Sequence, residues 1–338
     1  MILSSNKVIF RFLFVMILVI LTGCVDKSKK VLSKAEKEEY DTVFDLKSIE
    51  EEGNEILGAY YYGINNADNT RKEINILYDE ISLDITHFNI GSKSNIGWLV
   101  FVDGIPQVVK YGKQEFIMPI VSVDKESETN IQMLLEPLID RNKARHKFDI
   151  ACIFEPTYRG NRDYMGYGVY GSELPLCPYE IKGDFSNVQS ETIKQYGEIK
   201  NLPEEFAQKY TKIKRDGTLD SRIDKSDLLY ELTMDDQEVY EGFEFKDESE
   251  IDLILFGKLD ETYRITAFIN NELNPLFDGA STVDAPVTRG KITSLPINIE
   301  KGKLDDCNSL YFVIVPISDA NRDLDLVLTK TKSYTIIG

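Results

Sequence analysis

The sequence predicts an all-β protein made of two tandem immunoglobulin-like antiparallel β-sandwich domains that are joined by a partly helical connector. Short apolar segments separated by turn dipeptides recur from about residue 55 onward, and many short strands with such turns are typical of sandwiches. A similar series of segments recurs near the C-terminus, and the apolar periodicity between the two series changes.

The first series contains both kinds of strand pattern. Residues 81–85 alternate apolar and polar side chains, whereas residues 98–102 are continuously apolar and lead into Asp103-Gly104. Period-two alternation indicates a strand with one buried face, and Asp-Gly is a dipeptide typical of hairpin turns. Further strands are expected within residues 116–123, 131–138 and 148–154.

The second series follows the same order. Residues 251–256 correspond to the strand at 81–85, and residues 263–269 precede a turn at Asn270-Asn271. Residues 292–299 and 310–315 complete the set. The preferred interpretation is a tandem repeat. The alternative is two unrelated β-domains that use the same turn residues.

Two local matches give the repeat specific equivalences. Pro156 is followed by Asn161-Arg-Asp, and Pro316 is followed at the same spacing by Asn321-Arg-Asp. Further along, Tyr179 and Tyr334 each stand four residues before a glycine. We therefore expect Pro156 to be equivalent to Pro316, Asn161 to Asn321, and Tyr179 to Tyr334.

The predicted organisation has five parts. They are a signal peptide (1–23), a lipidated cysteine with its tether (24–52), a first β-sandwich (53–186), a connector (187–225) and a second β-sandwich (226–338). Within the connector, residues 188–200 and 203–213 are expected to be helical, with Pro203 suited to a first helical turn. A polar connector permits relative motion of two domains unless they share an apolar interface.

The N-terminus carries a targeting signal. Lys7 and Arg11 supply positive charge, and the apolar run at residues 12–21 is about half as long as a membrane-spanning helix. The Leu-Thr-Gly-Cys motif at residues 21–24 resembles the lipobox of bacterial lipoproteins. The resemblance implies that diacylglycerol is attached to the Cys24 thiol, that palmitate or a similar acyl chain anchors the protein, and that cleavage makes Cys24 the first residue. The alternatives are an ordinary secretory signal or an uncleaved anchor.

This resemblance implies a location at the outer face of the bacterial cell membrane. Two acyl chains suffice for durable anchoring. A net charge of −18 repels nucleic acid and anionic headgroups, so no nucleic-acid partner is expected. Besides Cys24, the chain has Cys152, Cys177 and Cys307, an odd number, so at least one thiol cannot pair within the chain. Buried thiols are favoured, and a Cys152–Cys177 bridge remains open.

Catalytic, metal and cofactor motifs are not evident in the sequence. It lacks Gly-x-Ser-x-Gly, phosphate-loop and CxxC patterns, and its two histidines, His87 and His146, are far apart. Residues 319–325 place Asp or Asn at alternate positions, as calcium loops do, but Leu324 stands where such loops need glycine. A polar turn is favoured there. Trp98 opens an apolar strand, which favours a core position over a sugar-stacking platform.

Residues 158–179, the Tyr/Gly segment, are the candidate binding site. Tyrosine and glycine together give large rigid contacts on an adaptable backbone, as in antibody loops. The second series is shorter at the corresponding place. The candidate residues are Tyr158, Arg162, Tyr164, Tyr167 and Tyr170. The alternative is an edge hairpin whose tyrosines pack on their own domain.

The preferred function is a non-enzymatic binding or adhesion-type lipoprotein that recognises an envelope protein or glycan. One alternative is a carbohydrate-active or other envelope enzyme on a sandwich scaffold, because catalysis by carboxylates leaves weak sequence traces. Another is a structural subunit of an envelope assembly. No catalytic residue, cofactor or metal ligand is predicted.

Overall fold

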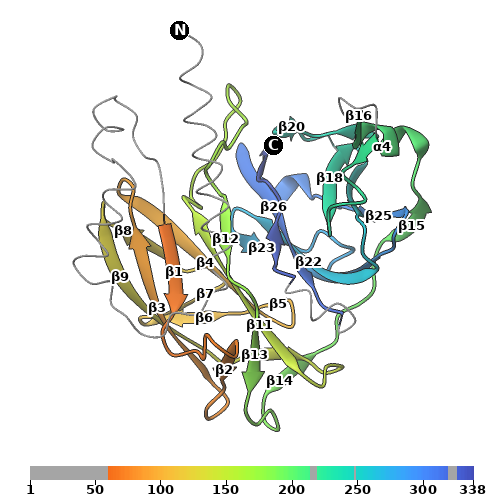
Figure 1. Cartoon of the computed structure of the whole chain (residues 1–338). Helices are drawn as coiled ribbons and strands as arrows, with labels where there is room; N and C mark the ends of the chain where they lie inside the picture. The colour runs from red at the N-terminus through yellow and green to blue at the C-terminus, as the bar shows by residue number, and fades with distance from the viewer. Residues whose placement is uncertain (1–59, 214–218, 247–248, 319–325) are drawn as a thin grey trace.

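The computed structural model describes residues 60–213, 219–246, 249–318 and 326–338 (Figure 1). The expected signal peptide, Cys24 and tether lie outside these residues, and so does the turn at 319–325. The described chain is almost entirely β and is built mainly from antiparallel strand pairs, with parallel pairs at β10–β14, β2–β13 and β20–β28, in sheets that pack face to face. The predicted all-β sandwich class is therefore confirmed.

The first half of the structure comprises strands β1 to β14. One sheet has the order β1 (Tyr60–Ile64), β3 (Ile81–Asn89), β9 (Ser127–Leu135), β6 (Val109–Tyr111) and β7 (Gln114–Phe116). The facing sheet has the order β2 (Glu73–Asn75), β13 (Tyr179–Lys182), β11 (His146–Phe154), β4 (Ser94–Val102) and β5 (Ile105–Pro106), with β8 (Ile120–Val123) on β4 and β12 (Glu173–Pro175) on β11. β10 (Leu138–Asp140) pairs with β14 (Gln189–Glu191).

The second half comprises strands β15 to β28. One sheet has the order β15 (Glu198–Asn201), β25 (Lys291–Pro296), β21 (Ile251–Phe256), β18 (Leu229–Met234) and β19 (Gln237–Glu238). The other has the order β20 (Gly242–Glu244), β28 (Tyr334–Ile337), β26 (Cys307–Pro316), β22 (Glu261–Ile269) and β23 (Glu272–Leu273), with β24 (Thr282–Val287) on β22 and β27 (Thr329–Lys330) on β26. Smaller elements are α4 (Glu204–Lys209), β16 (Thr211–Ile213), β17 (Leu219–Ser221) and the 3-10 turn η1 (Lys301–Lys303).

The larger sheets of the two halves have the same strand order, with each strand of one matched by a strand of the other. Their hairpin turns also correspond, because both central residues of each turn, Asp103-Gly104 and Asn270-Asn271, have positive φ angles of 52° to 76°. Such turns match the twist of the flanking strands. This agreement of topology and turn geometry supports the tandem repeat.

Strand register supports one predicted equivalence and corrects another. Tyr179 lies opposite Phe148, and Tyr334 lies opposite Leu310 at the corresponding place. Pro316, however, is the last residue of β26, whereas Pro156 lies two residues beyond the end of β11. The expected equivalence of the two prolines is therefore wrong by two residues. Asn321 lies outside the described residues.

The helix expected over residues 188–200 is wrong. This stretch contains β14, which pairs with β10, and β15, which pairs with β25. Strands β10 and β25 offer backbone hydrogen bonds to this stretch, and this pairing outweighs its weak helical pattern. In the next stretch, the helix expected over 203–213 is shortened to α4, and β16 follows it. β15 also places part of the expected connector in a sheet of the second half.

The two halves pack back to back through their larger sheets (Figure 1). Along β4, Trp98 and Val100 point into the core of the first half, whereas Leu99 and Phe101 point toward the second half. Both faces of these central strands are buried, which explains why their sequences are continuously apolar. The shared apolar cluster consists of Leu99, Phe101, Met118, Ala151, Ile153, Phe268, Tyr311, Val313, Val315 and Leu328.

Candidate functional site

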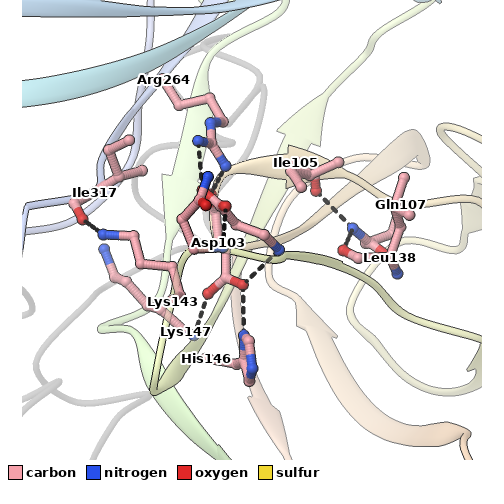
Figure 2. A network of polar contacts seen from close by, with 11 residues as sticks. Asp103, Ile105, Gln107, Leu138, Lys143, His146, Lys147, Arg264 and Ile317 are labelled. Atoms are coloured by element: carbon pink, nitrogen blue, oxygen red, sulfur yellow. Dashed lines mark hydrogen bonds and ion pairs between the residues drawn. The ribbon is translucent and has the colours of Figure 1, made fainter. Parts of the chain in front are cut away.

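A buried polar network closes one end of the interface between the halves (Figure 2). Arg264 on β22 is 1% exposed and binds both carboxylate oxygens of Asp284 on β24, at 2.6 and 2.8 Å. Its guanidinium also donates to Asp140 of the first half, at 2.8 Å. These partners hold the pKa of Arg264 above its ordinary value despite burial. The group therefore remains charged and joins the two halves.

The Asp103-Gly104 turn fits directly against Arg264. The backbone carbonyl of Asp103 accepts a bond of 2.8 Å from Arg264 Nη1. The Asp103 carboxylate lies 2.7 Å from His146 Nδ1 and accepts the backbone N–H of Lys147 at 2.9 Å (Figure 2). Lys143 reaches the carbonyl of Ile317 across the interface. All of these groups are satisfied within the protein, so this end has a structural role.

The Tyr/Gly segment covers the opposite end of the interface. Thr335 on β28 donates to the carbonyl of Met165, at 2.7 Å. A Cβ on Gly160 would lie 1.9 Å from the Thr335 hydroxyl, so only glycine permits this approach. Asn161 Oδ1 accepts the backbone N–H groups of Asp163 and Tyr164, both at 2.9 Å, which fixes a tight turn. That turn projects Tyr164 outward, where it is 55% exposed.

The five predicted site residues fall into two groups. Tyr158 stacks on Tyr170 at 4.4 Å between ring centres and contacts Tyr167 edge-on at 5.3 Å. Tyr167 is 8% exposed. This trio packs against its own half, as in the alternative interpretation. Arg162 and Tyr164 instead face the second half, where Arg162 lies 3.4 Å from Glu244.

A groove runs between the Tyr/Gly segment and the edge of the second half. Its volume is about 560 Å³, within the range of ligand pockets. One wall is formed by residues 162–165, and the floor is formed by Met234 and residues 237–243. Tyr240 on the floor is 66% exposed, so Tyr164 and Tyr240 present two aromatic surfaces at one groove.

The floor of this groove was not predicted from the sequence. Tyr240, Glu238 and Glu241 lie in the stretch that crosses from β19 to β20, more than seventy residues from Tyr164. The signal available in the sequence was Tyr240 itself, an aromatic residue between glutamates. An isolated aromatic residue carries little information until the fold brings the Tyr/Gly segment beside it.

The structure also places the other residues that the sequence singled out. Trp98 is fully buried and contacts Tyr62 edge-on at 4.7 Å, which confirms the core interpretation. Cys152 is buried, Cys177 and Cys307 are partly buried, and none of the three forms a disulfide with another described residue. Within the described residues, no cluster of three or more His, Cys, Asp or Glu side chains is placed to hold a metal ion. No helix in this part of the chain is long and apolar enough to span a bilayer.

Comparisons with known proteins return structural neighbours only. No family model and no curated protein matches the chain. One neighbour is a chain of the CsuC–CsuE chaperone–tip adhesion subunit pre-assembly complex from archaic chaperone-usher Csu pili of Acinetobacter baumannii, with 11% identity, a TM-score of 0.20 and coverage of 82% of this chain and 98% of that chain.

Two further neighbours have similar scores. A protein of unknown function from Porphyromonas gingivalis W83 has 11% identity and a TM-score of 0.19, over 82% of this chain and 99% of that chain. CBD12 from CALX1.2 has 7% identity and a TM-score of 0.19, over 82% and 98%. TM-scores of this size do not establish a common fold, so the sandwich assignment rests on the strand order described above.

Proposed function

We propose that the protein is a non-enzymatic binding module that is anchored to the outer face of the bacterial cell membrane through lipid on Cys24. It would recognise an envelope partner in the groove between the Tyr/Gly segment and the β19–β20 stretch. The observation that carries this proposal is the convergence of Tyr164 and Tyr240, both largely exposed, on one groove built from both halves.

Large exposed aromatic side chains are costly to leave in water and are enriched at the centres of binding surfaces. The groove also has rigid support, because Gly160 and Thr335 hold its wall against β28. A site on a rigid scaffold loses little entropy when a partner binds. The lipobox at residues 21–24 supports delivery of this surface to the cell exterior.

Site-specific photo-crosslinking in the producing cells tests the proposal. A benzophenone amino acid is placed at Tyr240 or at Tyr164, and matched cells carry it at Tyr78, which is 97% exposed but lies on the β2–β3 turn away from the groove. We expect the Tyr240 and Tyr164 positions to give the same adduct and the Tyr78 position to give none. Equal labelling at all three positions, or no adduct from the groove positions, would contradict the proposal.

A further inference from the structure

The floor of the groove includes a strand with an open edge. β20 pairs only with β28 among the described strands, in parallel register. The Glu241 carbonyl accepts from Thr335, and the Phe245 N–H donates to Ile337. Residues of a strand alternate in the direction of their backbone polar groups. The N–H and C=O groups of Gly242 and Glu244 therefore point away from β28, toward the open edge.

This edge is short and carries a charged side chain, Glu244, and both features limit pairing between sheet edges. It contains no proline, and no described strand pairs with it on this side. The Tyr/Gly segment crosses the face of β28 and β20, where Gly160 meets Thr335, and Arg162 makes an exposed pair with Glu244. The segment thus walls the groove while the polar groups of the edge remain directed outward. An extended backbone laid along β20 could satisfy them.

The charged side chains that line the groove indicate which class of ligand it favours. The groove lining carries one cation, Arg162, and three carboxylates, Asp163, Glu238 and Glu241. Lys209 already binds Glu238, and Lys332 lies beside the groove with its Nζ 5.5 Å from the Tyr240 ring centre. Within the described residues, neither Asp163 nor Glu241 is part of an ion pair, and both are exposed. These two carboxylates would attract basic side chains of a ligand.

We infer that the groove binds an extended polypeptide segment carrying lysine or arginine, which adds as a strand to the open edge of β20. This inference rests on the proposed function and specifies its ligand class. Main-chain hydrogen bonds to Gly242 and Glu244 would supply affinity that does not depend on the ligand's sequence. Tyr164 and Tyr240 would flank the added strand, and Asp163 and Glu241 would select basic side chains.

The test selects binders from a random decapeptide display library on the wild-type protein. The selected peptides are then measured against the wild-type protein and two variants at Glu244. Glu244→Pro removes the outward N–H, at a location where an edge strand tolerates proline. Glu244→Ala retains that N–H and removes the same carboxylate, so it is the matched control. We expect selected peptides to carry Lys or Arg at alternate positions. Their binding should fall at least tenfold in the proline variant and less than threefold in the alanine variant.

A second measurement keeps the test valid if Glu244→Pro does not fold. Selected peptides are N-methylated at alternate residues, which blocks one row of main-chain hydrogen bonds from the ligand side. Methylation in one of the two phases should weaken binding at least tenfold, and methylation in the other should not. Basic peptides that bind equally well in both phases, or selected peptides without basic residues, would overturn the inference.

Binding of a soluble chito-oligosaccharide distinguishes a failure of this inference from a failure of the proposed function. If the oligosaccharide binds, and Tyr164→Ala and Tyr240→Ala each remove that binding while no peptide is selected, the groove is a binding site but not for polypeptide. That outcome overturns the strand-addition inference and leaves the proposed function standing. If the groove variants change the binding of neither the peptides nor the oligosaccharide, and the crosslinks also fail, the inference and the proposed function are both wrong.

Discussion

Arg264 is a buried charged residue that links the two halves through its hydrogen bonds. Arg264 satisfies one carboxylate of its own half, one carboxylate of the other half and one backbone carbonyl. This role was not predictable from the sequence, because the partners of Arg264, Asp140 and Asp284, are distant from it in the chain. Buried polar groups of this kind are costly when a partner is lost.

Arg264→Met should therefore destabilise the protein strongly. It leaves Asp284 and Asp140 buried without their cation, and breaking such a pair costs about 3–5 kcal/mol. Urea denaturation followed by tyrosine and tryptophan fluorescence measures the change. The matched control is Arg162→Met, which also removes a bridge between the halves but an exposed one, with an expected loss of under about 1 kcal/mol. Similar losses in the two variants would contradict this account.

Lys330 gives a prediction about pH. It is 3% exposed, its Nζ lies 4.4 Å from the ring centre of Tyr311, and burial lowers its pKa to about 8 even though Glu173 is nearby. An unfolded lysine titrates near 10.4. Between these values the unfolded chain binds more protons than the folded one, so raising the pH favours the folded state.

Relative to Lys330→Met, the wild-type protein should gain stability as the pH rises from about 8 to about 10.4, by up to about 1.4 kcal/mol per pH unit. Below about pH 8 both states are protonated and the difference should be flat. Paired denaturation curves at several pH values give the difference, and subtraction removes the titration of other groups. A difference that does not change across this window would show that the Lys330 amine is not buried as described.

At the scale of elements, the local apolar pattern predicted the strands that have a buried face. It did not predict strands that form only because a partner strand is available. Alternation over residues 81–85 identified a strand because one face of β3 is buried. Residues 188–200 have no such pattern, and β14 and β15 exist because β10 and β25 offer partners. The continuous run at 98–102 was recognised as a strand, but the sequence could not say what covered its second face.

The Tyr/Gly segment was also predicted in part from the sequence and in part only from the fold. Its composition indicated recognition, yet only its fold separates Tyr164, which is exposed, from Tyr167, which is buried. Tyr167→Ala should cost stability by about 3 kcal/mol, because a buried aromatic side chain leaves a cavity. Tyr164→Ala should change the melting temperature little. Thermal melts of both variants provide the test, and equal losses would remove Tyr164 from the proposed groove.

At the scale of the whole molecule, the polar connector does not imply independent domains. The halves share an apolar cluster, a buried arginine network at one end and a groove at the other. The groove could not be predicted from the sequence, because it forms only when the Tyr/Gly segment of one half meets the β19–β20 stretch of the other. The recurring turns and apolar runs that suggest the repeat were visible in the sequence because they are local features.

Lipid attachment at Cys24 remains a prediction from the motif at residues 21–24. Cys24→Ser should release the protein from the membrane fraction without detergent, because the acyl chains account for its membrane affinity. Cell fractionation and immunoblotting measure the distribution, with Cys177→Ser as the control for loss of a thiol elsewhere. Retention of the Cys24→Ser protein in membranes would contradict the anchor.

Hydrogen exchange tests most directly whether the groove binds an envelope partner, by comparing the protein in envelope membranes from its own cells with the purified protein. We expect protection on binding to be concentrated around the two sides of the groove, in residues 237–245 and 162–166. The β2–β3 turn around Tyr78, also exposed, should exchange equally in both samples. Protection at that turn with none in the groove would contradict the account.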